Sequence, residues 1–186
     1  LESIIEKNIK KIEKDLNSFV SNISIMIETN ETNSVYISLM KKLDDKKIQQ
    51  KDIKHLIQDA KSQIIKAYPD KDIIHIIIKK YLINDSESNF IPYDQVCNKI
   101  SIDIEFICIT KTFVKKIENL FAKLQVNVKK IICLKYVKSL FLEKYPNNIC
   151  EIGYNLSKGF NKQEVVIIPK KIEKKGFFEK LFHFFN

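Results

Sequence analysis

The sequence predicts an α+β fold in which a small sheet carries helices packed on one face. Two segments, 53–64 and 113–124, have apolar residues at helical spacing on one side only, so each has a single face to bury. Residues 73–78 form an isoleucine run typical of a central strand covered on both faces. In residues 100–106 apolar and polar residues alternate, which indicates a strand with one face toward solvent.

The first half of the chain alternates between helical and extended patterns. The predicted elements are a helix over 1–19, strands at 23–27 and around 35–39, a helix containing 53–64, and the strand at 73–78. An Asn- and Thr-rich loop separates the first two strands. Asp44 and Asp45 open a polar stretch before the second helix, and Pro69 marks its end.

The second half begins with a predicted loop over 85–95, which contains Pro92. The elements expected after it are the strand at 100–106, a helix containing 113–124, a strand at 128–134, a short helix over 136–145, and strands at 149–152 and 164–168. Thr110 is placed to N-cap the 113–124 helix, and Pro146 ends the helix over 136–145.

The chain ends in an amphipathic segment after a basic run. On a helical wheel its apolar side chains fall within an arc of roughly 160°, and Lys180 lies on the opposite face with Glu179 and His183. Such a helix is far too short to span a bilayer, which needs about 20 apolar residues, but it suits a peripheral membrane anchor. A helix docked on the protein's own core would show the same stripe. The predicted membrane-binding residues are Phe177, Phe178, Leu181, Phe182, Phe184, Phe185, Lys170, Lys171, Lys174, Lys175 and Lys180.

Composition restricts the function classes. The net charge of +9 is spread along the whole chain, and all of the cationic side chains apart from histidine are lysines. The lack of arginine weakens a nucleic-acid interpretation, because bidentate recognition of guanine or phosphate favours Arg. The four cysteines, Cys97, Cys108, Cys133 and Cys150, lie too far apart for a zinc site or a disulfide framework. Buried, reduced thiols are expected.

No catalytic constellation emerges from the sequence. His55, His75 and His183 have no Cys, Ser or carboxylate at informative spacing, so each is expected to be a surface histidine or a buried one with satisfied hydrogen bonds. Asp103 and Glu105 share one strand face, which is normally solvated. With only 3 glycines the chain has no phosphate-binding loop. We therefore expect a protein that is not an enzyme and that uses no cofactor or metal.

Several segments, in the right order, resemble FtsA, the actin-like bacterial cell-division family that tethers FtsZ filaments to the membrane. LESIIEKNIKKIEK resembles the helix that enters the family's inserted subdomain, called 1C or SHS2, and ISIMIET and SVYISLM resemble its first strands. KKIQQKDIKHLIQDAKS resembles its helix, with Gln50, Asp52, Ile53 and Ala60 in corresponding places. IIHIIIKKYLIND resembles the family's next strand. The closing strand, helix and strand of the subdomain are resembled by three consecutive parts of this chain, namely IDIEFICIT, the helix after it, and LQVNV.

The resemblance implies an SHS2-like fold followed by a C-terminal amphipathic helix. It divides the chain into an entry helix (1–20), an SHS2/1C-like α+β domain (21–145), a degenerate remnant of an actin-like segment (146–169), and a basic linker with the membrane-targeting helix (170–186). In the remnant, CEIGYNLS stands where the family has its phosphate loop, and Tyr154 and Asn155 replace the glycines. Side chains there would block the approach of phosphate to the backbone, so ATP binding is not expected.

The resemblance also implies a function: a non-enzymatic divisome adaptor on the cytoplasmic face of the inner membrane. Its partners would be FtsN-like cytoplasmic tails, FtsZ indirectly, the anionic membrane surface and further copies of itself, without nucleic acid. Two alternatives stay open from the sequence. One is a basic nucleic-acid-binding domain, whose binding would depend steeply on salt. The other is a degraded remnant that folds but has no partner.

Overall fold

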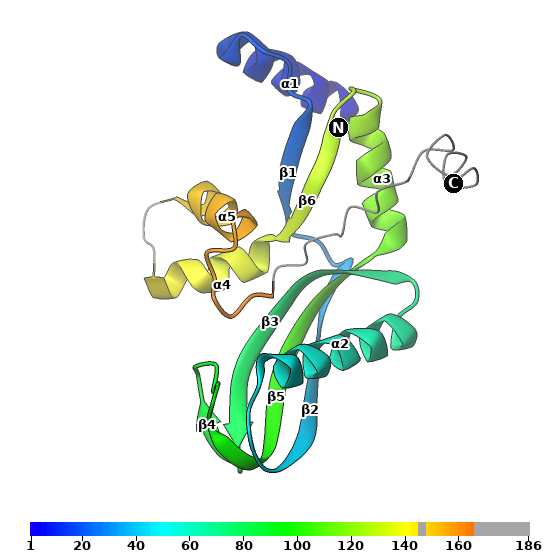
Figure 1. The fold of residues 1–186 in the computed structure, drawn as a ribbon. Helices are drawn as coiled ribbons and strands as arrows, with labels where there is room; N and C mark the ends of the chain where they lie inside the picture. The colour runs from blue at the N-terminus through cyan, green and yellow to red at the C-terminus, as the bar shows by residue number, and fades with distance from the viewer. Residues whose placement is uncertain (145–147, 166–186) are drawn as a thin grey trace, which may run out of the picture.

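The computed structural model describes residues 1–144 and 148–165 (Figure 1). The elements in these residues are α1 (Glu2–Leu16), β1 (Asn22–Ile27), β2 (Thr32–Lys47), α2 (Gln50–Ala67), β3 (Lys71–Ile83), β4 (Ser86–Ser88), β5 (Val96–Thr110), α3 (Lys111–Ala122), β6 (Asn127–Cys133), α4 (Leu134–Lys144) and α5 (Ile149–Ser157). The α+β class predicted from the sequence is confirmed.

The strands form two sheets. One has four antiparallel strands in the order β2-β5-β3-β4, and the other pairs β1 with β6 in parallel. Figure 1 shows the two sheets one above the other, with α2 lying across the larger sheet. The isoleucine run pairs with the alternating strand, because Ile76 and Ile78 of β3 lie opposite Phe106 and Ile104 of β5.

The main core lies between the larger sheet and α2. Strand β5 points its apolar residues, from Ile100 to Phe106, toward this core, where they are fully buried. Helix α2 meets them with the stripe predicted from the sequence, including Ile53, Leu56 and Ile64. Apolar residues recur every second position in β5 and at helical spacing in α2, and these two sets of side chains meet in the main core.

A second core covers part of the opposite face of the larger sheet, which we call the outer face. Ile77 and Ile107 pack there against Tyr136 and Val137 of α4 and against α5. Because Ile76 and Ile78 belong to the main core, strand β3 is covered on both faces, as its isoleucine run predicts. A register shift between Ile73 and His75 is a β-bulge that aligns His75 with Ile107.

The placement of α3 differs from the prediction that both helices lie on one face of the sheet. Helix α3 extends along the smaller sheet beside β6, and its residues are at most half-buried (Figure 1). The chain leaves the larger sheet at Thr110, directly before α3 begins, so the helix continues away from α2. Thr110 occupies the N-cap position, but its hydroxyl donates to the carboxylate of Glu31 at 2.7 Å and makes no cap bond.

The prediction of a strand at 149–152 is wrong, because these residues begin helix α5. Asn148 caps this helix, with its side-chain oxygen accepting hydrogen bonds from the amides of Cys150 and Glu151. Ile152 and Leu156, one helical turn apart, are buried in the second core. A short apolar run fits either a strand or a helix, and the cap decides between them.

Three smaller differences concern chain segments predicted as irregular or extended. Asp44 and Asp45 lie inside β2 with positive φ, at the irregularity between Lys42 and Lys46. The predicted loop at 85–95 contains the short strand β4. Of the predicted strand at 164–168, Glu164 forms a single bridge with Ile77, and 166–168 lie outside the described residues.

Asp52 allows a test of how α2 begins. Its buried carboxylate accepts from Lys41 Nζ at 2.8 Å and from the Gln49 amide at 2.9 Å, completing a capping box. Burial raises the pKa of Asp52, but these hydrogen bonds and the charge of Lys41 outweigh it, and the pKa is lower than usual. We expect Asp52→Asn to lower the free energy of unfolding by about 1 kcal/mol at neutral pH, the usual size of a lost cap.

The pH dependence of this effect has a definite sign. A folded-state pKa that is lowered stabilises the fold above the unfolded pKa of about 3.9, and this contribution disappears as the pH falls through the folded pKa. The difference between wild type and Asp52→Asn should therefore shrink below about pH 4. Urea denaturation at several pH values measures it, with Asp59→Asn, an exposed position on α2, as the matched control. An effect that does not change with pH would contradict the role of the carboxylate.

Candidate functional site: a polar cavity on the outer face

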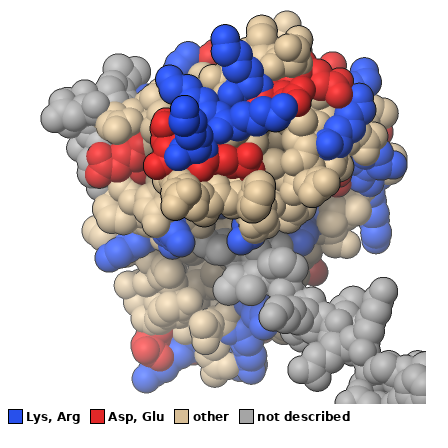
Figure 2. Space-filling view, turned by 90° about the horizontal axis from the view of Figure 1, so that it is seen from above, with Lys and Arg blue, Asp and Glu red and all other residues tan. Residues whose placement is uncertain are grey.

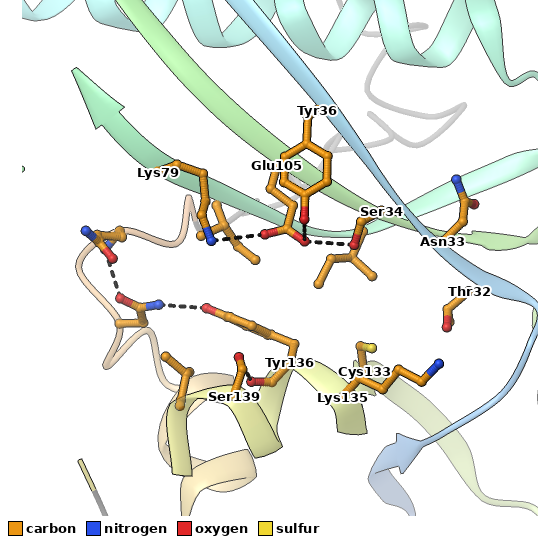
Figure 3. A pocket seen from close by; sticks show the side chains of 15 residues that line it. Thr32, Asn33, Ser34, Tyr36, Lys79, Glu105, Cys133, Lys135, Tyr136 and Ser139 are labelled. Atoms are coloured by element: carbon orange, nitrogen blue, oxygen red, sulfur yellow. Dashed lines mark hydrogen bonds and ion pairs between the residues drawn. The ribbon is translucent and has the colours of Figure 1, made fainter. Parts of the chain in front are cut away.

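A cavity of about 520 Å³ opens where the second core ends on the outer face of the larger sheet (Figure 3). Strands β2, β3 and β5 form one wall, and the end of β6, α4 and residues 161–163 form the other. The lining is mainly polar. It consists of Thr32, Asn33, Ser34, Tyr36, Ile77, Lys79, Glu105, Ile107, Cys133, Lys135, Tyr136, Ser139, Leu140, Asn161 and Gln163.

Glu105 lies at the centre of the sheet wall. Its carboxylate accepts from the Ser34 hydroxyl at 2.7 Å, from the Tyr36 hydroxyl at 3.1 Å and from Lys79 Nζ at 3.3 Å. These donors come from β2 and β3, the two neighbours of β5, and Figure 3 shows them converging on the carboxylate. Only 12% of the Glu105 side chain is exposed, so the cavity offers a largely desolvated negative charge.

Asp103 and Glu105 share a strand face, as predicted, but they do not act as a pair. Asp103 accepts from the Ser38 hydroxyl at 2.6 Å and lies 3.8 Å from Lys80 Nζ, whereas Glu105 has its own lysine. Asp103 does not line the cavity. Each carboxylate therefore has its own lysine and hydroxyl, and the two form separate ion pairs.

A buried network lies beside the cavity. The His75 ring accepts from the Cys133 amide at Nε2, at 3.0 Å, so the ring proton must be on Nδ1. Nδ1 then donates to Glu164 at 2.7 Å, and the Tyr136 hydroxyl donates to the other oxygen of Glu164 at 3.3 Å. Asn161 Nδ2 donates to the Tyr136 oxygen at 2.7 Å. Burial, and then the charge of Glu164, raise the pKa of Tyr136, so this hydroxyl stays protonated.

The network fixes the segment that follows α5. Residues 163–165 pair with β3 where β4 does not reach: the Ile78 amide donates to the Gln163 carbonyl, and the Val165 amide donates to the Ile76 carbonyl, both at 2.8 Å. Glu164, between them, directs its carboxylate into the interior toward His75. The segment thus adds a single antiparallel bridge to the larger sheet and closes one side of the cavity.

The histidines and cysteines in the described residues can be compared with the predictions. His55 is exposed, and His75 is buried with both ring nitrogens hydrogen-bonded, as expected for a satisfied histidine. All four cysteines are free, but only three of them are buried, because Cys150 is exposed. Gly153, within the segment compared with a phosphate loop, lies in α5, where a Cβ would approach Met26 Sδ to 3.2 Å.

The predicted membrane-binding residues and His183 lie outside the described residues. Within the described part, no helix is long and apolar enough to cross a membrane. Sequence reasoning missed the cavity and the roles of Tyr136, Asn161 and Glu164. One feature of the sequence could have indicated the role of Glu164. It is a charged residue at the start of segment 164–168, which is otherwise β-branched and suited to a buried strand.

Comparison with known proteins gives one match. Residues 29–108, somewhat less than half of the chain, match the family model described as the SHS2 domain inserted in FtsA. This range begins just before β2 and ends inside β5, so it contains β2, α2, β3, β4 and most of β5. A search of curated proteins finds no match.

Proposed function

We propose that the chain is a non-enzymatic adaptor of the division machinery, because residues 29–108 match the SHS2 domain that is inserted in the cell-division protein FtsA. In this proposal the domain binds a cytoplasmic segment of another division protein, of the FtsN type, and connects indirectly to FtsZ. The C-terminal segment holds the adaptor on the cytoplasmic face of the inner membrane. The family match is the observation that carries the proposal.

The chemistry of the cavity supports peptide binding. Carboxylate, hydroxyl and amide groups line it, and Glu105 supplies a partly desolvated charge for a basic side chain. Ile77, Ile107 and Leu140 add apolar surface to its two walls. A mainly polar lining around a carboxylate suits a polar or basic segment, and ligand sites are common at interfaces between substructures.

The groups around the cavity also support a role without catalysis. Both ring nitrogens of His75 are engaged, the Cys133 thiol is buried, and Glu105 is bound by three donors. A nucleophile needs a base within hydrogen-bond reach, and the buried His75 is committed to Glu164 and the Cys133 amide. Binding is therefore the activity that this arrangement favours.

The charge distribution does not favour the nucleic-acid alternative. Figure 2 looks down on the end that carries α1, and lysines stand next to acidic residues over much of that face. Lys10 pairs with Glu6, and Lys123 pairs with Glu2 in the same region. A nucleic-acid surface usually presents a continuous basic stripe instead.

A vesicle flotation experiment tests the membrane part of the proposal. We expect the full chain to float with vesicles that contain anionic lipid, and Phe182→Asp to abolish flotation. Burial of several Phe and Leu side chains contributes about 1.5–3 kcal/mol each, and an aspartate on that face removes much of the gain. Lys174→Ala should only reduce binding, because one lysine near the surface contributes about 1 kcal/mol. Equal flotation of a chain truncated before Gly176 would show that the tail is not the anchor.

The same experiment tests the adaptor role when a labelled cytoplasmic tail of an FtsN-type protein is added. The wild-type chain should carry the labelled peptide to the vesicles. Glu105→Ala should still float but should lose the peptide, because the cavity then lacks its carboxylate. Asp103→Asn is the matched control on the same strand, outside the cavity, and should retain the peptide. Equal recruitment by Glu105→Ala would place the peptide site elsewhere.

A further inference from the structure

Strand β2 forms one edge of the larger sheet, and its other side is unpaired within the described residues. It pairs with β5 from Thr32 to Lys42 without interruption, and the first irregularity comes only after Lys42. An edge strand of this length presents a row of free N–H and C=O groups to any second strand.

Residues 32–40 of this edge lack the features that normally prevent strand pairing, whereas lysines and an irregularity follow from Lys41 onward. Segment 32–40 (TNSVYISLM) has no charged residue, proline or glycine, in a chain that is 30% charged. Natural edge strands are usually protected by lysines, prolines or bulges. On the outer face, Tyr36 is 67% exposed and Met40 is 55% exposed. Over residues 32–40 the edge is therefore uncharged and unprotected.

The core face of β2 is incompletely covered. Val35, Ile37 and Leu39 point toward α2 but are only half-buried, whereas their partners on β5, Phe106, Ile104 and Ile102, are fully buried. Helix α2 packs on β2 and β5 together, so the uncovered part is on the edge side. One more strand beside β2 would bury these three side chains.

The sequence of β2 is complementary to itself about Ile37. In an antiparallel pair with a two-fold axis at this residue, Ile37 meets its own copy and Val35 meets Leu39 on the core face. On the outer face Tyr36 meets Ser38 and Ser34 meets Met40, and no lysine lies opposite another lysine. Register in sheets follows the apolar face, and this register matches all three apolar residues.

We propose that two copies of this chain associate through β2, antiparallel about Ile37, to form one continuous eight-stranded sheet. This interface goes beyond the proposed adaptor function and does not depend on it. A two-fold axis perpendicular to the sheet puts both outer faces, and therefore both polar cavities, on the same side of the dimer. Any segment bound in one cavity would then have a second site close to it, which raises avidity for a clustered partner.

Sedimentation equilibrium of the full chain in solution, without lipid, tests the association. We expect a mass of twice 21.9 kDa. The double variant Ser38→Lys, Met40→Lys should weaken the dimer at least about tenfold, because positive charges are then introduced along the edge and the two copies of position 38 lie diagonally across the pair from each other. Both positions are exposed and outside the cavity, and circular dichroism checks that the variant stays folded. Phe182→Asp is the control that excludes association through the tail, and it should remain dimeric.

Disulfide cross-linking tests the register in a Cys150→Ser background, which removes the exposed thiol. A mixture of Tyr36→Cys and Ser38→Cys chains should cross-link much more efficiently than either chain alone, because these positions are directly opposite only between copies. A monomeric wild type, or a dimer that is unaffected by the two lysines, would overturn the proposed interface. Efficient cross-linking of Tyr36→Cys alone would overturn the register. Each result is independent of peptide or vesicle binding.

Discussion

Glu164→Ala is expected to lower the free energy of unfolding by about 2–6 kcal/mol and to release residues 161–165 from the sheet. The carboxylate accepts from two buried donors, His75 Nδ1–H and the Tyr136 hydroxyl. A buried donor that loses its acceptor costs about 1–3 kcal/mol, and here two donors lose the same one. Alanine offers no acceptor, and neither ring can turn toward water without disturbing the second core.

Chemical denaturation measures the loss of stability, and hydrogen exchange at the Ile78 amide measures the release, because this amide donates to Gln163. Two controls separate the network from its surroundings. Gln163→Ala removes an exposed neighbouring side chain and should change stability by less than about 0.5 kcal/mol. Tyr136→Phe removes one of the two donors and should cost less than Glu164→Ala. Equal effects of Glu164→Ala and Gln163→Ala would contradict the network.

Phe106→Ala should lower the free energy of unfolding by about 3–5 kcal/mol, the range for a large aromatic side chain removed from a packed core. Phe106 is fully buried in β5 and lies between Val35 of β2 and Ile76 of β3. A cavity at this position would loosen contacts of three strands with α2 at once, and these elements have few ways to close it.

Phe90→Ala is the matched control, because the same atoms are removed from a side chain that is 82% exposed. It should change stability by no more than about 0.5 kcal/mol. Guanidinium denaturation of both variants gives the comparison. A loss below about 1 kcal/mol for Phe106→Ala would mean that the main core is not packed around β5 as described.

The parts of the fold that were predictable from the sequence are those in which the order of apolar residues shows which faces are buried. The alternation in 100–106 and the stripe in 53–64 both gave the correct element and the correct core side. Residues 149–152 were misassigned because a segment of four residues is too short to show a period, and only Asn148 indicated a helix. The position of α3 depends on where β5 leaves the larger sheet, and the local sequence of the helix does not indicate that position.

The candidate site was not predictable because its residues come from separate parts of the chain. Glu105, Tyr136 and Asn161 belong to a strand, a helix and a loop that only the folded chain brings together. The burial of Glu164 depends on His75, which lies 89 positions earlier. Taken alone, each of these residues could be an ordinary surface residue. No pattern in the sequence indicates the hydrogen bonds that join them in the folded chain.

The Thr110 amide donates to the Glu31 carbonyl at 3.3 Å, so the segment from β2 to β5 begins and ends at one point. Without this segment, β1, α3 and β6 are a parallel strand–helix–strand unit, the usual way to connect parallel neighbours. The larger sheet is therefore an insertion between the first strand and the helix of that unit.

The insertion has a kinetic consequence: β1 and β6 can pair at low entropic cost only after the inserted domain has folded and brought its two ends together. Slow folding of the inserted domain would delay the pairing of β1 with β6. Weakening the β1–β6 pair, in contrast, would leave the inserted domain able to fold first.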